Sequence, residues 1–199
     1  TFILGAMAAD FYPRLTAAAR DAPTSNRLVN EQAEIGILLA LPGLLATLAF
    51  SPWVIRILYS ARFNDAAQLL PWFLLGVFGR IVSWPMGFIM IAQGRARWFG
   101  ASEVMTGLLH LLFIQAGLRL FGLKGAALAF ALLYACHVVG MRLVAGRLTG
   151  FRWAPEVKRL LLESVLVIAA TLAVTVGIGG APGMLAAGCA AALCGLLCT

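Results

Sequence analysis

The sequence predicts an all-α protein whose helices cross a membrane several times. Of its 199 residues 62% are hydrophobic and only 12% are charged, and the mean hydropathy is +0.94. Such a chain has too little polar surface to cover a soluble globule. Its apolar blocks approach the roughly 20 helical residues that cross a hydrocarbon core of about 30 Å. They also lack the alternation of membrane barrel strands, so the spans are expected to be helices.

The apolar blocks predict a short apolar segment at residues 1–9 followed by six spans. Polar stretches at 10–31 and 146–158 are expected to be the longest loops. The sequence begins at Thr1 inside an apolar stretch with no basic region before it, so we see no signal peptide and expect a fragment of a larger protein. The expected spans lie near residues 32–50, 69–92, 100–118, 125–145, 160–178 and 183–198.

The distribution of Lys and Arg predicts the orientation of the bundle, because cytoplasmic loops carry an excess of these residues. One set of alternate loops contains only four: Arg56, Arg62, Arg119 and Lys124. The other set contains ten: Arg14, Arg20, Arg27, Arg95, Arg97, Arg142, Arg147, Arg152, Lys158 and Arg159. Loops 10–31, 93–98 and 146–158 are therefore expected in the cytoplasm, with Trp98 and Trp153 at that interface. The net charge of +7 is read as a topology signal and not as a nucleic-acid surface.

Two features have local alternatives. The segment 51–65 is expected either to lie in the membrane interface as an amphipathic helix or to extend the preceding span past Pro52. Pro42 and Pro85 fall inside spans, where proline removes a backbone donor and bends a helix. Bent spans suit alternating access but are also common in passive bundles.

The cysteines predict neither a metal site nor a catalytic centre. Cys136 and His137 are adjacent, so on a helix they point about 100° apart and do not converge on one ion. Free cysteine commonly packs as a small hydrophobe, and we expect that role here. No common catalytic or nucleotide-binding motif is present, so we expect no cofactor and no enzymatic activity. The other cysteines, Cys189, Cys194 and Cys198, share the last apolar block.

Arg80 is the most informative polar residue within a span. It lies eleven residues after Leu69 and twelve before Ala92, about 16 Å from the nearer end of the helix, too far for its side chain to reach the interface. A charge there costs several kcal/mol unless it faces a cavity or a partner, which makes it a candidate functional group. The alternative is a structural ion pair with an acid such as Glu103. Helical spacing places Gly76, Ser83, Trp84 and Gly87 on the same face.

The next span carries a polar stripe on one helical face, formed by Glu103, Thr106, Gly107 and His110. A carboxylate and an imidazole facing a cavity are suited to carry coupling protons. The alternative is a hydrated Glu103 near the cytoplasmic end and a His110 that donates one hydrogen bond to a neighbouring helix. His137 is a weaker candidate because Phe130, Leu133 and Met141 share its face. Arg159 and Glu163 are expected to form a solvated i, i+4 pair.

Several sequence motifs resemble a known family. Asp10-Phe11-Tyr12-Pro13-Arg14-Leu15 and Asn26-Arg27-Leu28-Val29-Asn30-Glu31-Gln32 resemble the cytoplasmic loop of O-antigen translocases in the multidrug/oligosaccharidyl-lipid/polysaccharide exporter superfamily. Leu41-Pro42-Gly43-Leu44, Ser51-Pro52-Trp53-Val54-Ile55 and Val82-Ser83-Trp84-Pro85-Met86-Gly87 are similar to the next two spans of that family. The resemblance covers roughly residues 8–146, and the last two spans match by hydropathy only.

The resemblance implies a two-lobed helical exporter of the bacterial inner membrane, with this chain in the C-terminal lobe. Its substrate would be an undecaprenyl-diphosphate-linked oligosaccharide, flipped from the cytoplasmic to the periplasmic leaflet. Expected partners are this substrate, membrane lipids, the N-terminal half of the protein and the polysaccharide polymerase machinery. Arginine suits a diphosphate through its planar fork of donors, so Arg80, with Ser83 and Trp84 beside it, is the expected substrate contact.

Two other function classes remain open at this stage. One is a cation-coupled drug antiporter of the same superfamily, with Glu103 and His110 as candidate coupling residues. The other is a membrane-embedded polysaccharide-processing enzyme, which would usually carry a large polar loop that this sequence lacks.

Overall fold

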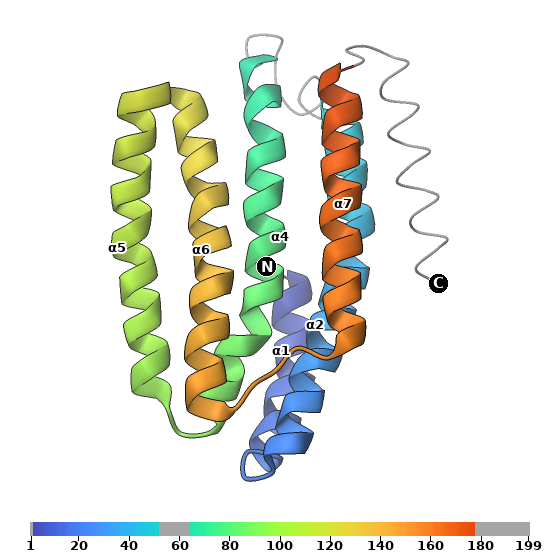
Figure 1. Cartoon of the computed structure of the whole chain (residues 1–199), viewed down its shortest axis with the longest axis vertical. Coiled ribbons are helices and arrows are strands. Elements are labelled where there is room, and N and C mark those ends of the chain that lie inside the picture. Colours follow the sequence, from blue (N-terminus) through green and yellow to red (C-terminus); the bar gives the residue numbers. More distant parts are fainter. Residues whose placement is uncertain (1, 52–63, 178–199) are drawn as a thin grey trace.

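The computed structural model describes residues 2–51 and 64–177, and the side chains within 9–51 and 69–173. That part of the chain contains six helices and no strand (Figure 1). Hydrophobic side chains cover most of each helix, as expected for helices that exchange water for lipid or for one another. The helices are α1 (Phe2–Ala17), α2 (Ala22–Ala49), α4 (Asn64–Ala92), α5 (Ala96–Phe121), α6 (Leu123–Thr149) and α7 (Pro155–Gly177).

The predicted fold class, an all-α transmembrane bundle, is confirmed. Four segments within the described residues are long and apolar enough to cross a membrane: Ala22–Ala49, Leu69–Ala92, Ala96–Phe121 and Leu123–Thr149. Three of them contain or coincide with predicted spans, Ala22–Ala49 covers the span 32–50 except for its last residue, and α7 covers nearly all of the fifth, 160–178. The predicted interfacial segment lies almost wholly outside the described residues, and the predicted sixth span, 183–198, does so entirely.

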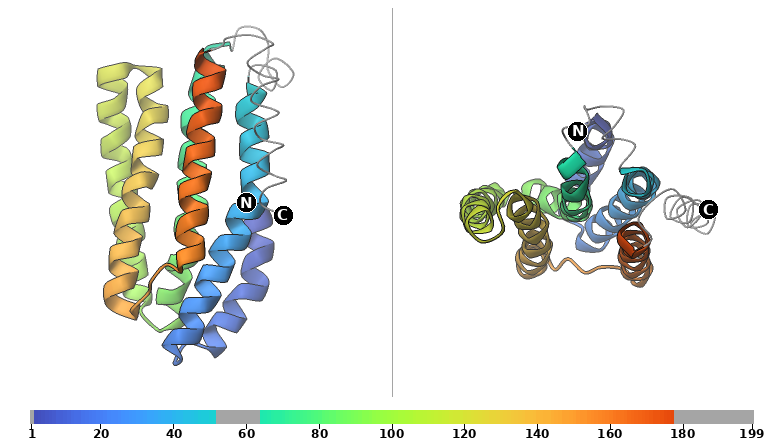
Figure 2. Two further views of the ribbon diagram at one scale, coloured as in Figure 1. Left: turned by 45° about the vertical axis from the view of Figure 1, so that its right-hand side comes forward. Right: turned by 90° about the horizontal axis from the view of Figure 1, so that it is seen from above.

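The helices are arranged around α4, which lies in the middle of the bundle (Figures 1 and 2). On one side α4 packs against α6, and α6 packs against α5, so that α5 forms the outer edge. On the other side α4 packs against α2, and α2 packs against α7. α1 is short and lies against both α2 and α4.

The stretch predicted as a long loop at residues 10–31 is instead mostly helical. α1 continues to Ala17 and α2 begins at Ala22, leaving a short turn between them. The carboxylate of Asp21 accepts a hydrogen bond from the backbone N–H of Thr24, and Pro23 occupies a first-turn position where no N–H is needed. Polar composition had suggested a loop, but polar residues also suit helix ends that extend beyond the lipid.

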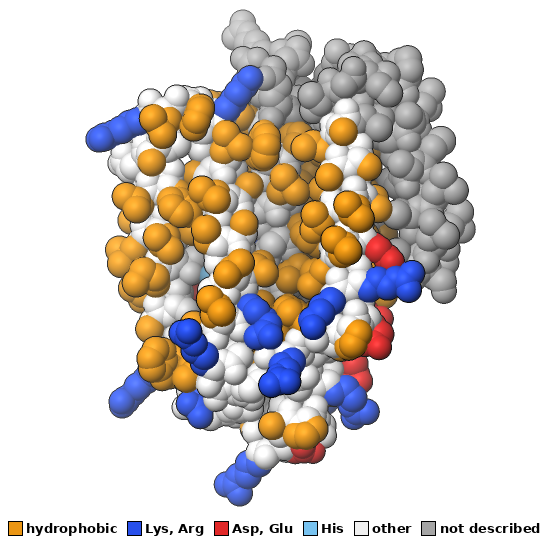
Figure 3. All heavy atoms as spheres, in the orientation of Figure 1, with side chains coloured by type: hydrophobic (Ala, Val, Ile, Leu, Met, Phe, Trp, Pro, Cys, Tyr) orange, Lys and Arg blue, Asp and Glu red, His pale blue; other side chains and the backbone are white. Residues whose placement is uncertain are grey.

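The basic side chains gather at one end of the bundle, the lower end in Figure 3. The turn after α1, the turn after α4 and the linker from α6 to α7 all lie at that end (Figure 1). The turn between α5 and α6 at Gly122 lies at the opposite end, where few Lys and Arg side chains are visible. The folded chain therefore has the charge asymmetry expected of a membrane protein with one basic face.

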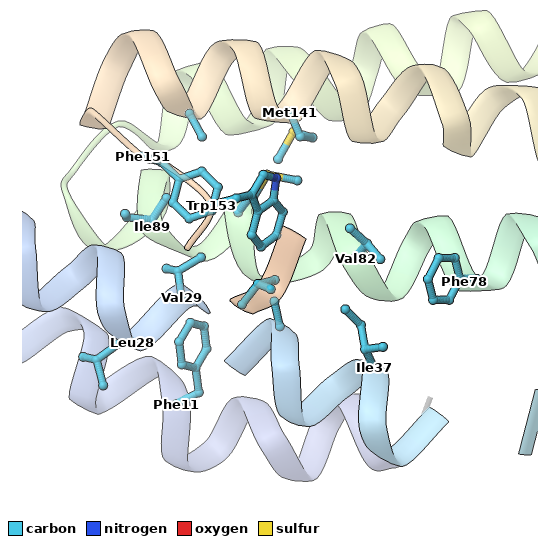
Figure 4. Packing of buried hydrophobic residues seen from close by; sticks show 14 of the residues in the cluster. Phe11, Leu28, Val29, Ile37, Phe78, Val82, Ile89, Met141, Phe151 and Trp153 are labelled. Atoms are coloured by element: carbon cyan, nitrogen blue, oxygen red, sulfur yellow. The ribbon is translucent and has the colours of Figure 1, made fainter. Parts of the chain in front are cut away.

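A buried cluster joins α1, α2, α4, α6 and the linker between α6 and α7 (Figure 4). Phe151 and Trp153 of the linker insert into it, with ring centroids 4.8 Å apart. Only 9% of Trp153 is exposed, so it packs within the bundle at the basic end and does not face lipid, and its depth relative to the membrane stays a prediction. Trp98 remains 56% exposed, as an interfacial tryptophan requires.

Proline and glycine shape the contacts of the central helices. Pro42 and Pro85 both lie inside continuous helices, and α2 runs obliquely in its lower part and more upright above (Figure 2). On α4, a Cβ added to Gly76 would overlap the ring of Phe130 on α6, and one on Gly79 would lie 3.0 Å from the Cβ of Tyr134. Small residues on α4 thus admit the aromatic side chains of α6.

Candidate functional site

Arg80 lies near the middle of α4, and its side chain is exposed on the surface of the chain. The described residues contain three ion pairs, Arg14–Asp10, Arg27–Glu31 and Arg159–Glu163, all between exposed residues four apart. The predicted Arg159–Glu163 pair is thus confirmed, with its atoms 2.7 Å apart. The alternative ion pair between Arg80 and Glu103 is not formed. An arginine at mid-span with no acid partner in the described part of the chain has a surface free for a ligand or another segment.

Ser83 and Trp84 do not extend the exposed surface of Arg80. The Ser83 side chain is buried, and its hydroxyl donates to the backbone carbonyl of Arg80 at 3.1 Å. The indole of Trp84 packs between aromatic residues of α1 and α4, with its centroid 6.2 Å from Phe11 and 4.6 Å from Phe88. Ser83 is buried and Trp84 is half-buried, so Arg80 is the most exposed member of the predicted substrate-binding set.

Aromatic side chains of α6 connect the α4 turn that carries Arg80 to the polar stripe on α5. Phe130 packs against Gly76, and its ring centroid lies 6.0 Å from His110. Tyr134 packs against Gly79, next to Arg80, and its ring centroid lies 5.9 Å from His137. Arg80 therefore lies at about the level of Phe130 and Tyr134 along the bundle. These rings contact His110 of α5 and His137 of α6, and no contact joins Arg80 to either histidine within the described residues.

The polar contact between α5 and α6 is made by Thr106 and His137, whose Oγ1 and Nδ1 atoms lie 2.9 Å apart. The hydroxyl of Thr106 also donates to the carbonyl of Ser102 at 2.8 Å. Since a hydroxyl has one hydrogen, His137 Nδ1 must donate to Thr106 and carry the proton. Glu103 lies one turn before Thr106 on the same face of α5.

The interhelical hydrogen bond expected of His110 is made by His137 instead, and the preference for His110 as a coupling residue stays a prediction. The missed signal was the position of the turn: α5 and α6 fold back on each other at Gly122, and Thr106 and His137 lie 16 and 15 residues from it. In an antiparallel hairpin, residues at equal distances from the turn are neighbours.

Cys136 does not pack as a buried small residue, since it is exposed in the described chain. It lines, with Thr106, His137 and Trp98, a groove of about 320 Å³ between α5 and α6. The described residues contain no group of three or more His, Cys, Asp or Glu side chains close enough to hold a metal ion. Cys189, Cys194 and Cys198 lie outside the described residues.

Asn26 and Asn30 of α2 hold the linker between α6 and α7, a role that the sequence did not reveal. Asn30 donates to the carbonyl of Arg152 at 3.0 Å and accepts from the N–H of Ala154 at 2.7 Å. Asn26 accepts from the N–H of Arg152 at 2.8 Å. The backbone N–H and C=O groups of an extended linker have no partners in a helix or sheet, and buried ones need hydrogen bonds. The two asparagine amides supply these hydrogen bonds. The helical i, i+4 spacing of two asparagines was the available signal.

No protein-family model matches the chain, and no curated protein sequence matches it. The resemblance to O-antigen translocases therefore stays a prediction carried by the sequence motifs.

Proposed function

We propose that this chain is part of an exporter in a bacterial inner membrane that flips a lipid-linked oligosaccharide from the cytoplasmic to the periplasmic leaflet by alternating access. The substrate would be an undecaprenyl-diphosphate-linked repeat unit of O-antigen or another polysaccharide. The observation that carries the proposal is Arg80, an exposed arginine near the middle of a candidate span with no acid partner in the described part of the chain. The N-terminal half of the exporter and the polymerase machinery are the partners that this function requires.

A diphosphate needs cationic contacts along its path through the bundle, because moving its charge through hydrocarbon alone is prohibitive. The guanidinium binds phosphate through two parallel hydrogen bonds, which a lysine does not reproduce. The bends near Pro42 and the aromatic residues beside Arg80 support a bundle that changes shape around a central path.

The polar residues of α5 and α6 also support a second candidate, a cation-coupled antiporter of the same superfamily. Glu103, His110 and the hydrogen-bonded His137 are the observation that favours it, because intramembrane carboxylates and imidazoles commonly carry coupling protons. The two functions differ in substrate, and a flippase that is coupled to protons would use both sets of residues.

The test is substitution of Arg80 in the full-length protein in cells that display O-antigen. Arg80→Ala is expected to abolish surface display while the protein accumulates at the normal level, and Arg80→Lys is expected to restore display only in part. The matched control is Arg119→Ala, an exposed arginine at the end of α5, which should leave display unchanged. Normal display in the Arg80→Ala strain would exclude Arg80 from transport. A fall in protein abundance would indicate a structural ion pair with a segment outside the described residues.

A further inference from the structure

A long apolar groove crosses the face of the bundle that includes α6 and α7. Its volume is about 810 Å³, and none of its lining residues is charged. α4 provides the floor with Gly79 and Val82, and α7 contributes Leu161 and Val165. α6 contributes Leu132 and Val138, and the groove continues over α6 onto α5. In water such a surface would be unfavourable, but it suits a hydrocarbon chain.

Three basic residues lie at the lower end of this groove. Arg142 is four residues after Val138 on α6, and Lys158 is three residues before Leu161 on α7, so each shares a helical face with a residue that lines the groove. Arg152 is exposed in the linker that joins these two helices. Figure 3 shows basic side chains gathered directly below the orange surface between α6 and α7.

The charges of these three residues are not neutralised within the described part of the chain. None of the three takes part in the ion pairs there, whereas Arg159, next to Lys158, is paired with Glu163. The positions of two are fixed by the fold: the backbone of Arg152 is held by Asn26 and Asn30, and the guanidinium of Arg142 lies 5.7 Å from the centre of the Phe151 ring. A cationic site beside a hydrocarbon groove matches an amphiphile with an anionic head.

We propose that this groove and its basic end bind one anionic phospholipid, with an acyl chain along α6 and α7 and its phosphate at Arg142, Arg152 and Lys158. Charge complementarity selects the occupant. The basic end is the end expected in the cytoplasm, and the cytoplasmic leaflet is where anionic phospholipids concentrate and attract juxtamembrane Lys and Arg. The site is distinct from Arg80, which does not line the groove, and it does not depend on the proposed transport activity.

The test compares the binding of brominated phosphatidylglycerol and brominated phosphatidylcholine to the purified full-length protein, with quenching of tryptophan fluorescence as the readout. Trp72 lines the groove, and it reports the occupancy of the groove once the other tryptophans of the protein are replaced by phenylalanine in every form tested. We expect phosphatidylglycerol to quench at a several-fold lower mole fraction than phosphatidylcholine. The triple variant Arg142→Gln, Arg152→Gln, Lys158→Gln should reduce that preference by roughly tenfold, because each basic residue near an anionic lipid surface adds to the affinity for that lipid.

The matched control is the triple variant Arg20→Gln, Arg95→Gln, Arg97→Gln, which removes the same charge from exposed positions at the same end of the bundle but away from the groove. It should keep the preference. A second pair of variants tests the apolar part of the groove. Ala131→Phe places a bulky side chain in the groove and should weaken quenching by both lipids. Leu112→Phe lies on the exposed face of α5 and should leave quenching unchanged. Circular dichroism of each variant identifies any that has lost its fold, and the remaining variants decide the result.

Three outcomes would overturn the proposal. The first is equal quenching by the two lipids in the unmodified protein. The second is an equal loss of preference in both triple variants, which would mean a general effect of surface charge. The third is displacement of the quencher by a polyprenyl phosphate but not by unlabelled phosphatidylglycerol, which would assign the groove to an isoprenoid lipid.

Discussion

α4 and α5 follow each other in the chain and look alike as sequences, yet they occupy opposite environments. The apolar segment of α4 has a mean hydropathy of 1.7 and that of α5 has 1.6. In the folded chain 56% of the residues in the most apolar stretch of α4 are buried, whereas none of those in the corresponding stretch of α5 is. Hydropathy therefore identifies both as membrane helices and does not distinguish the centre of the bundle from its edge.

The difference in burial arises from the residues that each helix has on the faces toward its neighbours. α4 has Gly76 and Gly79 on the face toward α6, which lets aromatic side chains sink against its backbone. α5 contacts the bundle mainly through α6, by a glycine contact near the turn and by the Thr106–His137 hydrogen bond. Its outward face is a row of exposed apolar side chains, suited to lipid or to the rest of the protein: Val104, Met105, Leu108, Leu111, Leu112 and Leu118.

The largest expected effect concerns the backbone contact between α5 and α6. A Cβ added to Gly125 would overlap the carbonyl group of Gly117, so Gly125→Leu must push the two helices apart. We expect a loss of more than about 3 kcal/mol in the free energy of unfolding, at or above the upper range for overpacking, because backbone cannot move aside as a side chain can. Gly107→Leu on α5, which has open space around it, is the control and should be tolerated. Denaturant unfolding in detergent, followed by circular dichroism, measures both; equal behaviour would refute the close contact.

The next effect concerns the α2 side of the bundle. There the side-chain amides of Asn26 and Asn30 hold the linker by hydrogen bonds, whereas α5 and α6 are held by a close contact between glycines. Asn30→Leu leaves the carbonyl of Arg152 and the N–H of Ala154 without their partner, at a cost of about 2–4 kcal/mol. Asn26→Leu removes one bond to the linker and should cost about half as much. The rate of trypsin cleavage after Arg152 reports release of the linker directly. A cleavage rate unchanged by Asn30→Leu would show that the aromatic residues, and not the amides, hold the linker.

A smaller effect is expected at the polar contact of the edge helix. Thr106→Val keeps the shape of the side chain and removes its hydrogen bond to His137, which should cost about 0.5–1.5 kcal/mol. Thr47→Val is the control, because within the described residues that hydroxyl bonds only to the Gly43 carbonyl of its own helix. A double-mutant cycle with His137→Phe isolates the pair. A coupling energy near zero would mean that α5 is held by glycine packing alone.

The smallest effect is a pH dependence at the start of α2. The side-chain hydroxyl of Thr24, followed by its backbone N–H, lowers the pKa of Asp21 below its ordinary value of 3.8. A lowered folded-state pKa means that the stabilisation is complete above about pH 3.8 and is lost as the pH falls through the folded-state pKa. Asp21→Asn and Thr24→Val should both reduce this acid-side slope. The measurement is the free energy of unfolding between about pH 2.5 and 5. Equal slopes against pH for the unmodified protein and the two variants would contradict the helix cap formed by Asp21 and Thr24.

Composition and the length of the apolar blocks were sufficient to predict the class of fold and the position of each described span. They work because lipid demands about 20 apolar residues per crossing whatever the neighbours of a helix are. The alternation of Lys and Arg between loops likewise predicted which turns share one end of the bundle, since that bias is a property of the chain and not of its packing.

Only the tertiary structure decided which helix is central, which polar groups meet, and which arginines stand unpaired. His137 and Thr106 lie 31 residues apart, and Asn30 and Arg152 lie 122 apart, so no local pattern joins them. Arg80 was visible in the sequence as a charge at mid-span, but its lack of an acid partner in the described chain depends on how α5 is rotated against α4 and α6. The sequence determines where a helix crosses the membrane because that is a matter of transfer free energy residue by residue. Contacts between helices depend on close packing of distant surfaces, which single residues do not encode.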